Sequence, residues 1–107
     1  IYGDGEQTRD FTFVADVVQA NIRAMESDVR GAFNIACGRR ISLNQLASTL
    51  MDIIGTRCDP IYEAPRAGDI RDSLADITRA REAFGYDPRY PVEEGLRQAV
   101  AWFREGA

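Results

Sequence analysis

Ile1-Tyr2-Gly3-Asp4-Gly5-Glu6-Gln7-Thr8-Arg9-Asp10-Phe11-Thr12-Phe13-Val14-Ala15-Asp16-Val17-Val18 is the stretch that decides the fold. Its Gly3-Asp4-Gly5 segment is typical of a turn. The alternation over residues 8–13 predicts a short strand with Arg9, Phe11 and Phe13 on one side. The period then becomes helical up to residue 25, with one apolar stripe formed by Val14, Val18, Ile22 and Met25 and with Val17 beside it. We therefore expect a strand that leads directly into a helix.

The helix after residue 42 has the clearest start in the chain. Ser42 and Gln45 have the spacing of a capping box, in which each side chain satisfies a free backbone N–H. Ile41 and Leu46 fit the hydrophobic staple that accompanies such a box. Gly55 suits a left-handed helix end. These residues predict a helix over about 43–54.

Short extended pieces and two further helices complete the chain. The patterns predict strands over 32–36 and 60–64 and an extended piece over 70–75. Asp76 can cap a helix that runs to Phe84, with Gly85 as its stop, and a last helix runs from about Val92 to Glu105. Four helices with three or four short strands predict a small α+β fold, with residues 1–107 as a single domain.

The predicted strands are too few and too short to form a dinucleotide-binding sheet. No G-x-x-G-x-x-G or G-x-G-x-x-G run follows any of them. We therefore expect this chain to bind no cofactor by itself.

All 13 basic residues are arginine, and lysine and histidine are both absent. Arginine stays charged and fits phosphate, but it is a poor proton shuttle. Without histidine the usual acid–base residue is missing, and without lysine there is neither a Schiff-base nucleophile nor a Tyr-x-x-x-Lys pair. The net charge of -4 argues against a general nucleic-acid binder. We therefore expect no catalytic residue in this chain and no nucleic acid as its partner.

The two cysteines, Cys37 and Cys58, belong to no C-x-x-C pair, and without histidine they predict no metal site. We expect two reduced, mostly buried thiols, although a disulfide between them stays open. No apolar run approaches the roughly 20 residues that span a bilayer, and no signal peptide is visible, so we expect a cytoplasmic protein without membrane contact. The chain starts at Ile1 without a methionine, and we expect it to be a fragment of a longer protein.

Two short motifs can bind an anionic ligand. Arg9 lies on the predicted strand beside a glycine-containing turn, where it can hold a phosphate. Arg66 and Asp69 share one loop, where the guanidinium can bind a diphosphate oxygen and the carboxylate can accept hydrogen bonds from two ribose hydroxyls. On spacing alone, a surface salt bridge at Arg9 and a local ion pair in the loop stay open as alternatives. We interpret a third candidate, the Arg39-Arg40 turn, as solvated.

With these motifs in this order, the chain resembles the C-terminal, substrate-binding lobe of extended short-chain dehydrogenases. The resemblance is to the NAD-dependent epimerase/dehydratase family, and within it to the UDP-glucose 4-epimerase-like members. It covers essentially the whole chain and implies an α+β lobe without the Rossmann lobe that holds NAD. The segments that carry it are residues 1–18, Phe33-Asn34-Ile35-Ala36, Ile41-Ser42-Leu43-Asn44-Gln45-Leu46, Pro65-Arg66-Ala67-Gly68-Asp69-Ile70-Arg71, Ser73-Leu74-Ala75-Asp76 and Glu93-Glu94-Gly95-Leu96.

The resemblance implies a site for a nucleotide sugar. In such enzymes, arginines at the positions of Arg9 and Arg66 grip the diphosphate, and an aspartate at the position of Asp69 holds the nucleotide ribose. Phe11 and Ser73 are weaker matches near the same ligand. The family passes a hydride from the sugar to NAD and back. A Tyr-x-x-x-Lys pair and a Ser or Thr do the proton work, and all of these are missing here.

Because the family binds its ligand between two lobes, we expect this lobe to bind a UDP-sugar only weakly and to be inactive as an enzyme by itself. We expect the surface that would face the missing lobe to be partly apolar and to favour a homo-oligomer. Two alternatives stay open: a stand-alone truncated module for binding or interaction, and a folded remnant without activity. The sequence leaves open which sugar the nucleotide carries. It also leaves open whether the full-length enzyme is an epimerase, a dehydratase or a decarboxylase.

Overall fold

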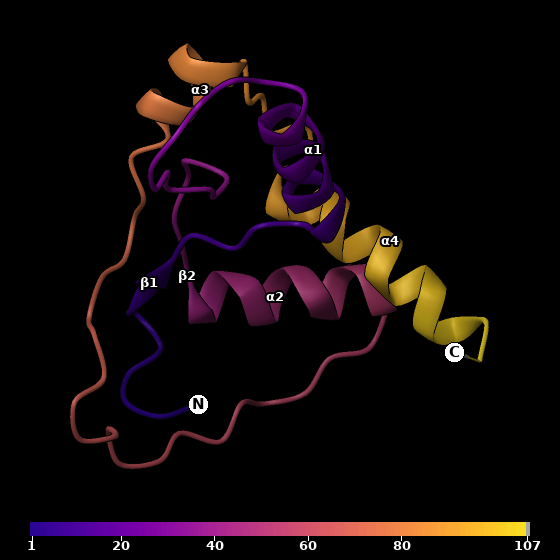
Figure 1. Cartoon of the computed structure of the whole chain (residues 1–107). Coiled ribbons are helices and arrows are strands. Elements are labelled where there is room, and N and C mark those ends of the chain that lie inside the picture. The colour runs from indigo at the N-terminus through magenta and orange to yellow at the C-terminus, as the bar shows by residue number, and fades with distance from the viewer. Residues whose placement is uncertain (107) are drawn as a thin grey trace.

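Four helices and one two-stranded sheet are formed by residues 1–106, the part of the chain that the computed structural model describes. In chain order the elements are β1 (Thr8–Arg9), α1 (Val14–Met25), β2 (Ile41–Ser42), α2 (Leu43–Ile54), α3 (Thr78–Phe84) and α4 (Val92–Arg104) (Figure 1). This content confirms the small α+β fold expected from the sequence. None of the helices in residues 1–106 has the length and apolar character needed to cross a lipid bilayer.

Strand β1 lies between two segments that come from distant parts of the chain. On one side it pairs antiparallel with β2, in a register that places Thr8 opposite Ser42. On the other side, Thr8 donates its N–H to the carbonyl of Arg71 at 3.0 Å, and its own carbonyl accepts the N–H of Ser73 at 3.1 Å. Strand β1 therefore connects both neighbours.

The strands are shorter than the sequence predicted. The predicted 8–13 strand is limited to Thr8–Arg9, and the predicted 60–64 strand is reduced to one parallel bridge between Glu63 and Tyr2. Residues 32–36 form no strand, so that prediction was wrong. Their backbone groups pair with no other backbone segment among residues 1–106. An extended segment becomes a strand only when another segment completes its hydrogen-bond ladder.

Helix α2 begins and ends where the sequence predicted. Ser42 Oγ accepts the N–H of Gln45 at 3.1 Å, and Gln45 Oε1 accepts the N–H of Ser42 at 3.1 Å, which confirms the capping box. Gly55 ends the helix with φ 82°, a left-handed conformation that glycine adopts at little cost. Helix α3 begins just after Asp76, whose carboxylate accepts the N–H of Thr78 at 2.9 Å.

The apolar stripe of α1 faces solvent, whereas such a stripe normally packs on a core. Val14 is 66 %, Val18 is 49 % and Met25 is 78 % exposed. The buried residues of α1 are Asp16 and Ala20. The Asp16 carboxylate accepts two backbone N–H groups from residues 89–90, at 2.8 and 3.1 Å. The helix is thus fastened on its polar side, and its apolar stripe stays largely open to solvent.

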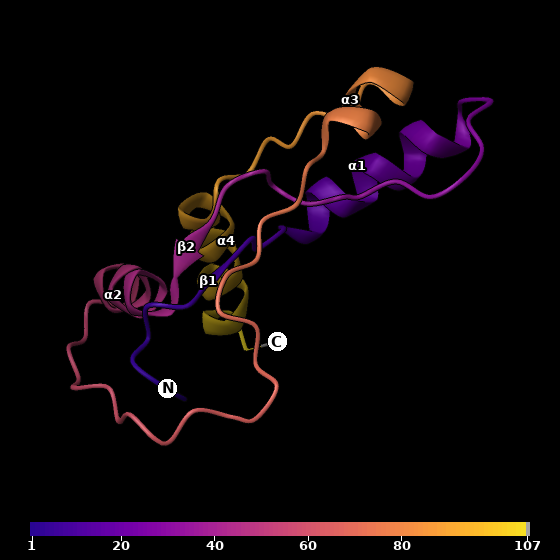
Figure 2. The ribbon, with the colours of Figure 1, turned by 90° about the vertical axis from the view of Figure 1, so that its left-hand side faces the viewer.

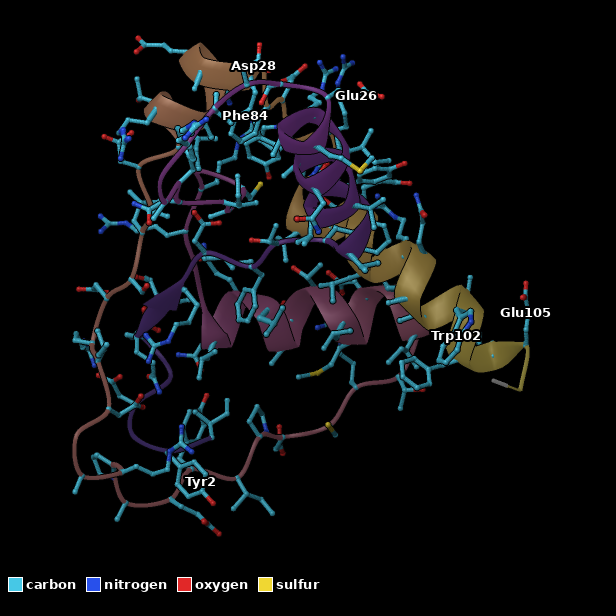
Figure 3. All side chains as sticks on the ribbon, in the orientation of Figure 1. Tyr2, Glu26, Asp28, Phe84, Trp102 and Glu105 are labelled. Atoms are coloured by element: carbon cyan, nitrogen blue, oxygen red, sulfur yellow. The ribbon has the colours of Figure 1, made fainter. Side chains whose placement is uncertain are left out.

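A small core joins α1, α3 and the extended segment 33–36. Its buried members are Ala20, Ala36, Ile77, Ala80 and Tyr86, and Phe33, Ile35, Ala75 and Phe84 pack against them. The rings of Phe33 and Phe84 meet edge to face with their centroids 5.2 Å apart. The buried hydroxyl of Tyr86 donates to the carbonyl of Ala36 at 2.6 Å. Figure 3 shows Phe84 at the end of the molecule that lies far from Tyr2.

The chain is open rather than packed around one centre. Its radius of gyration is 16.2 Å, against about 13 Å for a compact domain of this length. Residues 55–77 form neither a helix nor a strand, and they run past α2, the N-terminus and β1 before they reach α3 (Figures 1 and 2). Loops of this length within a domain usually serve a function.

Both cysteines are free thiols, so the disulfide that the sequence left open is not formed. Cys37 is buried as expected, and burial raises the pKa of its thiol. Cys58 is exposed, which corrects the expectation that both thiols are mostly buried. The turn after Cys37 is fixed by Asp10, whose carboxylate accepts the N–H groups of Cys37 and Gly38, each at 2.9 Å.

The buried hydroxyl of Tyr86 makes folding sensitive to high pH. Burial, with a further contribution from Asp16, raises the pKa of Tyr86 from 10.0 to about 12. A pKa that is higher in the folded chain gives a stabilisation that is complete below pH 10 and is lost as the pH rises to 12. We expect the free energy of unfolding to fall by roughly 2–3 kcal/mol over this window.

Urea unfolding at a series of pH values measures this fall, and Tyr86→Phe is the matching variant. The variant loses about 1 kcal/mol at neutral pH with its hydrogen bond to Ala36. Its stability then declines less between pH 10 and 12 than that of the wild type. An identical decline in both proteins would contradict the role of the Tyr86 hydroxyl.

Candidate functional site: a cavity between the N-terminal segment and the long loop

An open cavity of about 510 Å³ lies between the N-terminal segment and the loop 55–77. Its lining residues are Tyr2, Gly3, Asp4, Gln7, Glu63, Pro65, Arg66, Asp69, Ile70 and Arg71. We call it the Arg66 cavity. Figure 3 shows Tyr2 at this end of the molecule, beside the loop.

Backbone hydrogen bonds hold the two walls of the Arg66 cavity together. The N–H of Gly3 donates to the carbonyl of Glu63 at 2.8 Å, and the N–H of Thr8 donates to the carbonyl of Arg71 at 3.0 Å. These bonds fasten the loop just before and just after residues 64–70. Two stretches that are far apart in sequence therefore face each other across one cavity.

Arg66 presents its cation to the cavity without a charged partner. Its guanidinium carbon lies 5.1 Å from the centre of the Tyr2 ring, in a cation–π contact. No ion pair or hydrogen bond involves its side chain within residues 1–106, so the local ion pair that the sequence left open for Arg66 and Asp69 is not formed. All five N–H donors of Arg66 are thus available to an oxyanion.

Arg9 is held beside the cavity by three acceptors. Its Nη2 donates to Asp69 Oδ1 at 2.9 Å, and its Nη1 donates to the carbonyls of Thr8 at 2.6 Å and Arg71 at 3.3 Å. The salt bridge that stayed open as an alternative for Arg9 therefore exists, with Asp69 as its partner. Because its partner Asp69 lines the cavity, Arg9 lies next to the cavity that Arg66 lines. Arg9 keeps its Nε and one Nη2 hydrogen for a ligand.

Asp4 and Arg71 form a second pair on the cavity wall. Asp4 accepts from both terminal nitrogens of Arg71, at 2.8 and 3.2 Å, and from the N–H of Glu6 at 2.9 Å. The hydrogen bonds from Arg71 and then from Glu6 lower the pKa of the Asp4 carboxyl. The charge of Arg71 is thereby matched, which leaves Arg66 as the cation that is open to an anionic ligand.

Two of the predicted site residues lie outside the Arg66 cavity. Phe11 lines a separate depression of about 450 Å³, together with the exposed Arg39 and Arg40. Ser73 is exposed and is held through its backbone N–H, which donates to Thr8. The structure thus brings three predicted residues together, two in the cavity and one beside it. The binding roles of all five stay predictions.

Among the lining residues that were not nominated from the sequence are Tyr2, Gln7 and Arg71. Gln7 is 6 % exposed, and its Nε2 donates to the carbonyl of Tyr2 at 2.7 Å. Its position two residues before Arg9 was a usable signal, because alternate residues of an extended chain share a side. Tyr2 and Arg71 gave no such signal, since their contacts depend on where the loop folds.

The polar groups of the cavity suit an anionic ligand. It combines one open guanidinium with carboxylate and amide oxygens, a set that suits an anion carrying hydroxyl groups. Neither histidine nor lysine is available to move a proton at neutral pH.

Comparison with known proteins identifies the family. Residues 1–99 match the GDP-mannose 4,6 dehydratase family. The chain belongs to this family. The match confirms the predicted resemblance to the C-terminal part of extended short-chain dehydrogenases of the epimerase/dehydratase type.

Relatives of the chain include UDP-sugar epimerases. The UDP-glucose 4-epimerase of Mycolicibacterium smegmatis is 40 % identical over 105 residues, which are 97 % of this chain and 34 % of the relative. The crystal structure of UDP-glucose 4-epimerase from Thermotoga maritima with UDP-glucose has a TM-score of 0.94 and 45 % identity, over 99 % of this chain and 34 % of its own. The UDP-N-acetylglucosamine 4-epimerase of Methanobrevibacter ruminantium, in complex with UDP-N-acetylmuramic acid, has a TM-score of 0.93 and 40 % identity, over 100 % of this chain and 34 % of its own. The chain thus spans about a third of the length of these relatives.

The pairing of Asp4 with Arg71 makes a testable prediction about titration. Replacing Arg71→Met removes the charge and the donors that lower the pKa of Asp4, so this pKa should rise toward the ordinary value of 3.8. NMR titration of the Asp4 carboxyl carbon measures the change. The control Arg79→Met removes an arginine that stacks on Phe33 at 4.9 Å, outside the cavity lining, and it should leave the Asp4 titration unchanged.

The sign of the pH dependence follows from the same shift. A pKa that is lower in the folded chain gives a stabilisation that is present above the ordinary value of 3.8 and is lost as the pH falls below it. An Asp4 titration curve that is the same in wild type and Arg71→Met would show that the pair does not form in solution.

Proposed function

We propose that this chain is the nucleotide-sugar recognition part of an NAD-dependent sugar-nucleotide epimerase or dehydratase, and that it binds a UDP-sugar. One observation carries the proposal: Arg66 and Asp69 share a cavity, and Asp69 is paired with Arg9. The similarity to epimerases whose solved structures hold UDP-glucose and UDP-N-acetylmuramic acid supports it.

In the proposed complex, Arg66 and Arg9 bind the diphosphate, and Asp69 binds the ribose. Arg9 can accept the ligand without losing Asp69, because its Nε and one Nη2 hydrogen are not used by the contacts to Asp69, Thr8 and Arg71. Asp69 meets Arg9 through Oδ1, which leaves Oδ2 for ribose hydroxyls. Phe11 and Ser73 remain weaker candidates, because they lie outside the Arg66 cavity.

The described residues do not fit NAD. The sheet of residues 1–106 has two strands of two residues each, whereas a dinucleotide needs a parallel sheet with a glycine-rich turn at a helix start. We propose that this chain is catalytically incomplete alone and that it contributes substrate binding to the longer enzyme.

The domain organisation and the cellular location of the chain are also proposals. We treat residues 1–107 as one domain and place the protein in the cytoplasm, where unpaired thiols such as Cys37 and Cys58 are usual.

The proposed function is tested by titrating the 107-residue chain with UDP-glucose. Two-dimensional NMR spectra recorded at each ligand concentration measure the binding. We expect weak binding, in the millimolar range, because one wall of the family site buries few ligand atoms. Arg66→Ala should weaken this binding at least about tenfold, since a hydrogen bond to a charged group contributes about 1.5–3 kcal/mol. The matched control Arg79→Ala removes an arginine that is also stacked on an aromatic ring but lies outside the cavity lining, and it should bind as the wild type does.

The outcomes separate the alternatives. Binding that depends on Arg66 supports the recognition part of an epimerase and also a stand-alone binding module, and a reading frame upstream of Ile1 that encodes Tyr-x-x-x-Lys favours the former. Absence of binding at millimolar UDP-glucose contradicts the proposal and favours a remnant without ligand-binding activity.

We further propose that the isolated chain forms a homo-oligomer through the exposed stripe of α1. This stripe continues onto α4, because Val14 lines a groove together with Trp102 and Phe103. Trp102 is 58 % and Phe103 is 71 % exposed, and Figure 3 shows Trp102 on α4, away from the Arg66 cavity. Connected apolar surface of this kind favours association.

Light scattering at high concentration tests this association. The wild type should form a dimer or a larger assembly, and the double variant Val18→Glu, Ile22→Glu should be monomeric, because it places two charges within the stripe. Asn21→Glu adds a charge at an exposed polar position of the same helix and should leave the assembly intact. A wild type that stays monomeric at high concentration would rule out the proposed interface.

A further inference from the structure

The depression that Phe11 lines is a second open cavity, of about 450 Å³. Residues from the segment 37–41, from helix α2 and from the start of α4 contribute its walls, with β2 leading directly into α2 (Figure 1). We call it the Arg39–Arg40 cavity. It shares no lining residue with the Arg66 cavity. The proposed nucleotide-sugar site therefore gives this second cavity no role.

Two guanidinium groups of this cavity have no counter-charge. Arg39 and Arg40 are exposed, and within residues 1–106 neither side chain forms an ion pair, a hydrogen bond or a stacking contact with an aromatic ring. Two neighbouring like charges in a concave surface attract an anion more strongly than one does. All N–H donors of both guanidinium groups are thus open to an oxyanion.

The turn that carries the two arginines has a fixed backbone. The Asp10 carboxylate accepts the N–H groups of Cys37 and Gly38, each at 2.9 Å. Gly38 has φ 79°, a left-handed conformation that glycine adopts at little cost. On the other side of the arginines, Ile41 belongs to strand β2. A ligand that binds here therefore orders two side chains and no loop, which limits the entropy lost on binding.

Helix α2 adds neutral hydrogen-bond donors to the same cavity. Gln45 is oriented by the capping box, in which its Oε1 accepts the N–H of Ser42 at 3.1 Å, and its Nε2 donates to no group within residues 1–106. Ser48 and Thr49 follow three and four residues later, on the same side of the helix. Their hydroxyls form no hydrogen bond within the described part of the chain. One amide and two hydroxyls therefore remain for a ligand.

The acidic residue on the cavity wall is already paired. Glu93 lines the cavity, and its carboxylate accepts from Arg97, one turn further along α4. Burial raises the pKa of the Cys37 thiol, so this lining residue adds no negative charge at neutral pH. The lining thus combines two unmatched cations and several neutral donors with one neutralised carboxylate. Such a set is suited to an anion.

We propose that the Arg39–Arg40 cavity is a second ligand site, which binds the phosphate monoester of a small hydroxylated molecule. The two guanidinium groups bind the phosphate oxygens, and Gln45, Ser48 and Thr49 bind the rest of the ligand. A phosphate monoester carries about two negative charges at neutral pH and matches two cations, whereas a carboxylate carries one. The inference does not depend on the proposed function, because the two cavities have no residue in common.

The experiment titrates glucose 6-phosphate, as the probe, into the Arg66→Ala chain at neutral pH and constant ionic strength. This background removes the open cation of the other cavity. Two-dimensional NMR spectra should show saturable shifts in residues 37–41 and 45–49, with a dissociation constant in the millimolar range. Inorganic phosphate should bind more weakly, because it reaches fewer groups, and glucose should not bind. Equal affinity for phosphate and the monoester would overturn the proposed ligand.

The double variant Arg39→Gln, Arg40→Gln should weaken binding of the probe at least about tenfold, since it removes two charged donors. Its matched control is Arg23→Gln, Arg30→Gln. These two arginines are also exposed and free of ion pairs within residues 1–106, but they line neither cavity. An equal loss in both double variants would reduce the effect to net charge and overturn the site.

A second pair of changes tests the cavity at unchanged charge. Ser48→Ala, Thr49→Ala should weaken binding of the probe about three- to tenfold, because two hydrogen bonds to the ligand are lost. Unchanged affinity would overturn the proposal, since the arginines would then attract anions without a built site.

UDP-glucose separates this site from the proposed function. In the otherwise wild-type chain, Arg39→Gln, Arg40→Gln should leave UDP-glucose binding unchanged, because both residues lie outside the Arg66 cavity. Loss of UDP-glucose binding in this variant would make the two cavities parts of one site and overturn the inference. A wild type that binds glucose 6-phosphate but not UDP-glucose contradicts the proposed function and leaves the second site standing.

Discussion

The backbone pairing of Thr8 with residues 71–73 is the constraint on which the candidate site depends. Thr8 is hydrogen-bonded to this segment through both its N–H and its carbonyl, while its strand pairs with β2 on the other side. The next side chain along β1, that of Arg9, therefore reaches Asp69 and the carbonyl of Arg71. A long loop without internal helix or strand is given a defined position by a few bonds to one short strand. The walls of the Arg66 cavity follow from this junction.

Charge in the cavity is organised by pairing. Asp4 matches Arg71 and Asp69 matches Arg9, so these four groups fix geometry while contributing little net field. Arg66 stands apart from both pairs and meets an aromatic face instead. This arrangement suits a ligand that has one strongly charged part and several hydroxyls. The paired carboxylates can accept hydrogen bonds from the hydroxyls, and the guanidinium of Arg66 can bind the charged part.

The rest of the molecule has the features of one part of a larger unit. The apolar stripe of α1 is exposed, the extended segment 32–36 has no ladder partner among residues 1–106, and the radius of gyration exceeds that of a compact domain. The small core around Tyr86 holds α1 and α3 together at the end away from the cavity. These observations agree with a chain that spans about a third of the length of its relatives.

The sequence by itself determined what depends on neighbours along the chain. Some features depend only on residues that are close in sequence, within one or two helical turns. They are the capping box at Ser42, the glycine at the end of α2, Gly55, and the bounds of α1. The ordered motifs were also enough to predict the family and to nominate Arg66 and Asp69. Only the tertiary structure decided which strands exist and which side of α1 is covered, because both depend on a partner segment that spacing does not reveal. Only the tertiary structure also showed the contact between Tyr2 and Arg66. This contact depends on the path of the loop 55–77, which is fixed by hydrogen bonds to residues far away in the sequence.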